Sequence, residues 1–160
     1  MKTAYRSLAG LICGLVMLQA ASEAWFASGV GKYIAEGGTI DMSDTSGPPP
    51  FTEVWGLIVH TISGLYVIPV VAAILLIVGY LTHDRRALAL AAVVVILVGV
   101  QVTLGLTASS FTFLAFLHGF NALLLFGVAL TAALTLGRQH LEPAPAPAAA
   151  PSRRSVGSGV

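Results

Sequence analysis

Residues 55–81 read WGLIVHTISGLYVIPVVAAILLIVGYL, an unbroken stretch without a single Asp, Glu, Lys or Arg side chain. A helix needs about 20 predominantly apolar residues to cross a hydrocarbon core of roughly 30 Å, and a run of about 18 already marks a candidate. This stretch is long enough and apolar enough to span a bilayer. We therefore expect a transmembrane helix here.

Three further apolar stretches accompany it, at residues 7–30, 87–107 and 111–136. In lipid, a spanning segment must satisfy its own backbone N–H and C=O groups, and an α-helix does so without a partner segment. The sequence therefore predicts an all-α polytopic membrane protein. We expect one domain over residues 1–140, built as an antiparallel bundle of four transmembrane helices.

The composition supports the same class. Apolar side chains make up 56% of the chain, charged side chains make up 9%, and the mean hydropathy is +0.88, whereas soluble domains have about 25% charged residues. The formal charge of +1 offers no basic stripe, which excludes nucleic acid as a partner. The single cysteine, Cys13, excludes an intramolecular disulfide and a cysteine-based metal cluster, and we interpret it as a small core residue.

The charges predict the orientation. The polar loop 31–54 carries four acids against Lys32 alone. Alternate junctions are flanked by basic residues, namely Lys2, Arg6, Arg85, Arg86 and Arg138. By the positive-inside rule, we expect both termini in the cytoplasm and the loop outside, in a multi-pass protein of the bacterial inner (plasma) membrane.

The two ends of the chain carry separate predictions. Residues 141–160 are rich in Pro and Ala and then in Ser and Gly, which predicts a disordered cytoplasmic tail. At the other end, Lys2 and Arg6, an apolar stretch over 8–18 and small residues over 20–24 also fit a cleaved secretory signal peptide. That alternative to a retained first helix stays open at this point.

Each predicted helix contains polar side chains that break its apolar pattern. In chain order they are Gln19 and Glu23, then His60, then Gln101, then His118 and Asn121. Counted at ~1.5 Å per residue from the outer helix ends, Glu23, His60, Gln101 and His118 lie ~10, ~8, ~9 and ~10 Å deep. Ionisable groups inside a membrane are costly and mark candidate functional sites. We therefore expect one polar layer near the outer face.

Small residues surround the two histidines. Gly56 and Gly64 lie four residues before and after His60, whereas Ala115 and Ala122 lie three residues before and four residues after His118. Because these positions remove side chains beside each imidazole, a flat and bulky ligand could approach both helix backbones. Two neutral imidazoles facing each other in a helix bundle are the usual axial pair of a haem iron.

The leading hypothesis is therefore one b-type haem held between His60 and His118. Gln101, Asn121 and Glu23 are expected to orient an imidazole or to meet a propionate. With both axial positions filled, electron transfer or haem handling is favoured over enzymatic oxygen chemistry. A periplasmic redox partner or a larger membrane complex would then be the expected partner.

Two other functions fit the same residues. Small-residue stripes also let helices pack closely in lipid, in which case the chain is a cofactor-free accessory subunit of a membrane complex. Alternatively, Glu23, His60 and His118 form a cation site, since imidazole and carboxylate groups suit zinc, copper or iron.

Over residues 55–137, the sequence resembles one four-helix half of haem A synthase. Gln101–Gly105 (QVTLG) is similar to the Gln-x-x-Leu-Gly signature of the third helix of such a half, and Phe116–Ala122 (FLHGFNA) is similar to its fourth-helix histidine segment. His60 stands in the place of the second-helix histidine. The resemblance implies a membrane bundle that holds haem between these two histidines.

The chain departs from the synthase around its second-helix histidine. Gly56 and Thr61 stand where the catalytic half has Glu and Arg, and the outer-loop cysteine pair of many synthases is absent. The resemblance therefore implies haem binding without the hydroxylating chemistry. The fourth-helix pattern also resembles that of a small uncharacterised family of bacterial four-helix membrane proteins.

Overall fold

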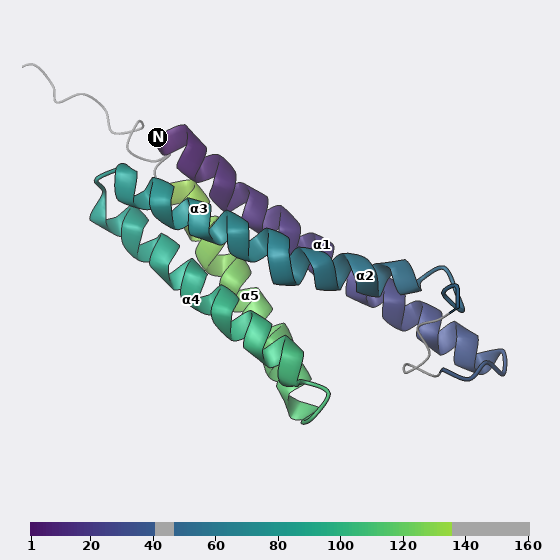
Figure 1. Ribbon diagram of the computed structural model, residues 1–160. Coiled ribbons are helices and arrows are strands. Elements are labelled where there is room, and N and C mark those ends of the chain that lie inside the picture. Colours follow the sequence, from purple (N-terminus) through teal and green to yellow (C-terminus); the bar gives the residue numbers. More distant parts are fainter. Residues whose placement is uncertain (41–46, 136–160) are drawn as a thin grey trace, which may run out of the picture.

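A computed structural model of the 160-residue chain describes residues 1–40 and 47–135. Its elements, in chain order, are α1 (Lys2–Ala35), α2 (Val54–Ile62), the π-helical turn η1 (Ser63–Val67), α3 (Ile68–Leu81), α4 (Arg85–Thr107) and α5 (Phe113–Thr135). Figure 1 shows α2, η1 and α3 following one another along a single rod. Over the described residues, the prediction of an all-helical chain with four helices long and apolar enough to cross a membrane is confirmed. The predicted tail at 141–160 lies outside those residues.

The first helix is longer than predicted, with 34 residues from Lys2 to Ala35 in place of the expected span 7–30. At ~1.5 Å per residue its length is about 51 Å, well above a hydrocarbon core of roughly 30 Å. Gly37 ends it at a φ of +88°, and the N–H of Gly38 donates to the carbonyl of Tyr33 over 2.9 Å. These are the marks of a Schellman cap, which requires a left-handed residue. Helical backbone therefore occupies the first residues of the predicted polar loop.

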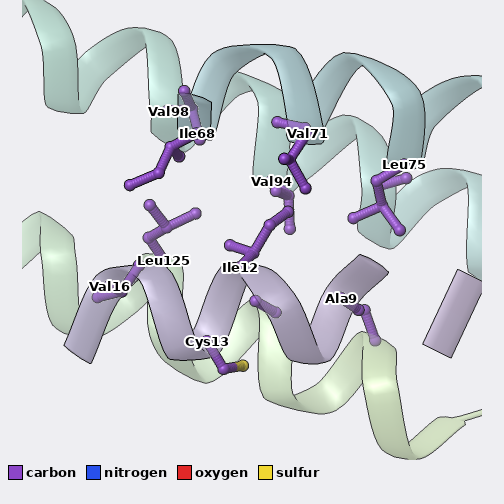
Figure 2. Packing of buried hydrophobic residues seen from close by; sticks show 14 of the residues in the cluster. Ala9, Ile12, Cys13, Val16, Ile68, Val71, Leu75, Val94, Val98 and Leu125 are labelled. Carbon is purple, nitrogen blue, oxygen red and sulfur yellow. The ribbon is translucent and has the colours of Figure 1, made fainter. Parts of the chain in front are cut away.

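The core lies toward the end of the molecule where the chain begins. Each long helix contributes a side chain that is almost completely buried: Ile12 from α1, Leu75 from α3, Val94 from α4 and Leu125 from α5. Figure 2 shows the side chains of these four residues in the space between the helices, with Ile12 and Val94 between Leu125 and Leu75. Tyr5 adds a buried hydrogen bond, because its hydroxyl donates to the carbonyl of Ala87 over 2.8 Å. The four helices are therefore held together at this end.

At the opposite end, the helices separate into two pairs. There α2 packs on α1, and α4 packs on α5, while Figure 1 shows the first pair diverging from the second. Gly56 explains how α2 approaches α1 so closely, since a Cβ at this position would lie 2.4 Å from the carbonyl oxygen of Ser22. The region between the two pairs is where the predicted polar residues lie.

Candidate functional site

A cavity of about 490 Å³ lies between the helix pairs and is lined by residues of all four long helices. Ligand cavities in proteins commonly measure about 300–1,000 Å³. Five of the seven predicted site residues lie on its wall, namely Glu23, His60, Gly64, Gln101 and His118. The wall does not include Gly56 or Asn121. The structure thus brings one predicted polar residue from each long helix to a common space.

The two histidines face the cavity from different helix pairs, His60 from α2 and His118 from α5. Their ring centres are 6.0 Å apart, and the ring planes are inclined by 48°. Two metal–nitrogen bonds of about 2 Å, each extended by about 1.1 Å to a ring centre, place the centres of two opposed imidazole ligands about 6.2 Å apart. The observed ring-centre distance differs from this value by about 0.2 Å.

Both rings are anchored through the same nitrogen. His60 Nδ1 lies 3.2 Å from the carbonyl oxygen of Gln19, and His118 Nδ1 lies 3.0 Å from the carbonyl oxygen of Gln101. A carbonyl only accepts, so each Nδ1 must donate its proton, and a neutral ring then keeps its lone pair on Nε2. Metal-binding histidines are oriented in this way by a partner on the other nitrogen. The arrangement therefore presents two imidazoles in a form that can bind a metal.

Behind His118, a polar network joins α4 and α5. The side-chain amide of Asn121 donates to Gln101 Oε1 over 2.6 Å and to the carbonyl of Leu97 over 3.0 Å. Asn121 is only 6% exposed. Its side chain bonds to Gln101, whose backbone carbonyl holds His118, and it does not line the cavity. Gly105 completes the arrangement, because a Cβ there would lie 3.1 Å from His118 Cε1. The lack of a side chain at Gly105 therefore lets the imidazole lie against α4.

Behind His60, a second network joins α1 and α2. The side-chain amide of Gln19 donates to the carbonyl of His60 over 3.0 Å and also to the hydroxyl oxygen of Ser63. The Ser63 hydroxyl donates in turn to the carbonyl of Val59. Sequence reasoning missed Ser63, although a signal was present: it follows His60 by three residues, as Asn121 follows His118.

Glu23 lies beside this second network, at a distance from His60 that is longer than a hydrogen bond. Its Oε2 is 3.8 Å from His60 Nδ1, and its side chain is 49% exposed, so the pair is ionic only when His60 is protonated. Among the residues that the structure describes, no group of three or more His, Cys, Asp or Glu side chains is placed to hold a metal ion.

The two glycines that flank His60 have different surroundings. Gly56 lies against the α1 backbone, which is the arrangement expected of close helix packing. Gly64 is on the cavity wall, where an added Cβ would lie 3.3 Å from Gln19 Oε1. One glycine thus lets the helices approach each other, and the other leaves room for the amide that supports His60.

Comparison of the chain with protein-family models, with curated proteins and with solved structures finds no match.

Proposed function

We propose that this protein binds one b-type haem between His60 and His118 and serves in electron transfer or haem handling. One observation carries the proposal: two imidazoles from diagonally related helices, 6.0 Å apart at their centres, share one cavity and are both anchored through Nδ1. A donating Nδ1 leaves each neutral ring its Nε2 lone pair for a metal. The resemblance to a half of haem A synthase supports the same assignment.

The proposal places the four helices across the bacterial inner membrane as an antiparallel bundle. Large apolar side chains are exposed along every helix, as lipid contact requires; Met17, Ile77, Ile96 and Leu123 are each at least 59% exposed. Basic residues lie at the starts of α1 and α4, namely Lys2, Arg6, Arg85 and Arg86. The two histidines lie instead near the starts of α2 and α5. With the starts of α1 and α4 in the cytoplasm, the haem lies near the outer face.

Several residues of the cavity wall have small side chains or none, which leaves room for a haem. Gly64, Gly105, Ala115, Gly119 and Ala122 bring little side-chain volume to the wall. The wall residues include Glu23 and no Lys or Arg, so propionates gain no cation from them and are expected to point away from Glu23. In this arrangement, Asn121 and Gln101 orient His118, and neither is needed to bind a propionate.

When bound, haem with two histidine ligands supplies a one-electron couple. His60 and His118 would hold the iron, and a haem with both ligands supplied by the protein would carry electrons instead of activating oxygen. Their Nδ1 partners are backbone carbonyls of α1 and α4, so the rings are held by the helices themselves. A stable pair of ligands of this kind favours electron transfer over catalysis.

Visible spectra of the detergent-purified protein, before and after dithionite, test the proposal. We expect a Soret band that shifts on reduction, and its loss or marked weakening in His60→Ala and in His118→Ala. His83→Ala is the matched control, because His83 is exposed in the turn between α3 and α4, where its Nδ1 lies 3.1 Å from the carbonyl oxygen of Leu81. A protein without a Soret band, or a band that survives both substitutions, would refute haem binding at this site.

A cofactor-free accessory subunit is the second candidate. One observation favours it: in the described part of the chain, every buried side-chain nitrogen or oxygen already has a hydrogen-bond partner. The polar networks around His60 and His118 are thus complete as packing devices. An absent Soret band together with co-purifying membrane subunits would support this reading.

A further inference from the structure

The two helix pairs hold their histidines with the same pattern of residues. In each pair, the backbone carbonyl of a glutamine on one helix accepts from the Nδ1 of a histidine on the other. In each pair, the side chain of that glutamine also bonds to the polar residue three positions after the histidine. The two sets are Gln19, His60 and Ser63 between α1 and α2, and Gln101, His118 and Asn121 between α4 and α5.

The α1–α2 set uses the donor capacity of the glutamine amide nitrogen. One N–H of Gln19 donates to the backbone carbonyl of His60 and the other donates to Ser63 Oγ. The Ser63 hydroxyl has a single proton, which it donates to the carbonyl of Val59. Gln19 therefore contacts the chain on both sides of the point where α2 passes into the π-helical turn η1.

This position matters because η1 begins at Ser63, only three residues after His60. A π-helical turn departs from the regular hydrogen-bond ladder, and such turns often occur at functional sites. Gln19 supplies the carbonyl of His60 with a donor from another helix at this irregular point. These side-chain bonds keep the backbone carbonyl oxygen of Gln19 within hydrogen-bond distance of His60 Nδ1.

We propose that Gln19 and Ser63 are positioning residues for His60, equivalent to Gln101 and Asn121 for His118. The inference rests on the proposed haem function and extends it to residues outside the predicted site. Loss of the Gln19 amide frees α2 to shift along α1, and His60 Nδ1 then loses its acceptor. The ring is released to rotate and to change its protonated nitrogen.

The first test needs no haem. The ¹⁵N spectrum of haem-free protein, labelled at histidine and held in lipid nanodiscs, reports which ring nitrogen carries the proton. Spectra of His60→Ala and His118→Ala assign the signals. We expect the Nδ1–H form for His60 in the wild type and an Nδ1–H/Nε2–H mixture in Gln19→Leu and in Ser63→Ala, with the His118 signals unchanged.

Thr103→Val is the matched control for Ser63→Ala. The Thr103 hydroxyl also donates to a carbonyl four residues earlier in its own helix, that of Gly99, but it is exposed and accepts no bond from a neighbouring helix in the described structure. We expect Thr103→Val to leave the His60 signals of the wild type unchanged. When the Gln19→Leu variant is reverted to glutamine, we expect His60 to return to the Nδ1–H form.

The second test uses the haem-loaded protein. Outer residues that orient metal-binding histidines typically contribute about 10- to 100-fold to metal affinity, so we expect haem affinity to fall by about that factor in Gln19→Leu. A high-spin ferric signal is also expected in electron paramagnetic resonance, because His60 dissociates. Wild-type haem binding with an unaltered His60 tautomer and an unaltered spin state in both variants would overturn the positioning role alone. A wild type without a Soret band would instead overturn the proposed function.

Discussion

Gly56→Ala is the substitution in which close helix packing opposes helix propensity most directly. Alanine in place of glycine inside a helix ordinarily stabilises it by about 1 kcal/mol. At Gly56, the new methyl group would lie 2.4 Å from the Ser22 carbonyl oxygen and 3.1 Å from the Phe26 nitrogen. Both atoms belong to the α1 backbone, so neither can move aside as a side chain would.

The size of the effect follows from these distances. Ordinary van der Waals contact begins at 3.4 Å, so α2 must move about 1 Å away from α1 to accept the methyl group. A shift of that size would stretch the His60 Nδ1 to Gln19 oxygen distance from 3.2 Å to beyond hydrogen-bond range. Overpacking costs about 1–3 kcal/mol and the lost hydrogen bond about 0.5–1.5 kcal/mol. After the gain in propensity, we expect a net destabilisation of about 0.5–3.5 kcal/mol.

Gly99→Ala supplies the control, since Gly99 is also inside a helix but a Cβ there would meet nothing within 4 Å. We expect this variant to gain up to about 1 kcal/mol. The assay is equilibrium unfolding in mixed micelles of a mild detergent and dodecyl sulfate, followed by circular dichroism at fixed protein concentration. If Gly56→Ala proves as stable as the wild type, or matches the gain of Gly99→Ala, the close approach of α2 to α1 is wrong.

Two further predictions concern the end that holds the core. Tyr5→Phe should lower the free energy of unfolding by about 0.5–1.5 kcal/mol, because it removes the buried hydroxyl that donates to Ala87, whereas Tyr66→Phe, at a side chain that is 66% exposed, should change it little; equal effects in the two variants would contradict the buried bond. Asp84→Ala should cost about 0.5–2 kcal/mol, since its carboxylate caps α4 by accepting from the N–H groups of Arg86 and Ala87. Asp84→Asn, which keeps a capping oxygen, should recover most of the loss in the same unfolding assay, and an Asn variant as unstable as the Ala variant would argue against the cap.

The N-terminal helix shows how tertiary structure bears on an alternative that sequence left open. A signal peptide and a first transmembrane helix share a basic start and an apolar stretch, so local pattern does not separate them. In the structure, Tyr5, Ile12 and Val16 of α1 contribute buried side chains to the core. Removal of residues up to about Ala20 would therefore expose core-facing side chains of α3 and α5.

Helix existence and approximate bounds were predictable because they depend on local hydropathy and on turn residues. The spans 55–81 and 87–107 differ from the observed helices by two residues or fewer at each end. The extension of α1 to Ala35 was not predicted, because residues 31–35 begin with Gly31 and Lys32 and were assigned to the polar loop that follows. Helical backbone nevertheless continues until a glycine accepts a left-handed conformation.

The depth of each polar residue could likewise be read from the chain, since rise per residue is constant along a helix. Depth does not determine rotation, and rotation decides which side chains meet. Asn121 lies about one helical turn deeper than His118, and it bonds to Gln101 instead of lying on the cavity wall. Ser63 is a small polar residue in an otherwise apolar stretch, and it becomes a partner of Gln19 only because α2 lies against α1.

By itself, the sequence determined four apolar helices and a set of polar residues at one level, because hydrophobicity and helical rise are properties of single segments. Only the tertiary structure decided that the helices form two diverging pairs with His60 and His118 centred 6.0 Å apart between them. The physical reason is that helix pairing depends on small contacts at particular positions. Gly56 lets α2 approach α1, and Gly105 lets His118 lie against α4.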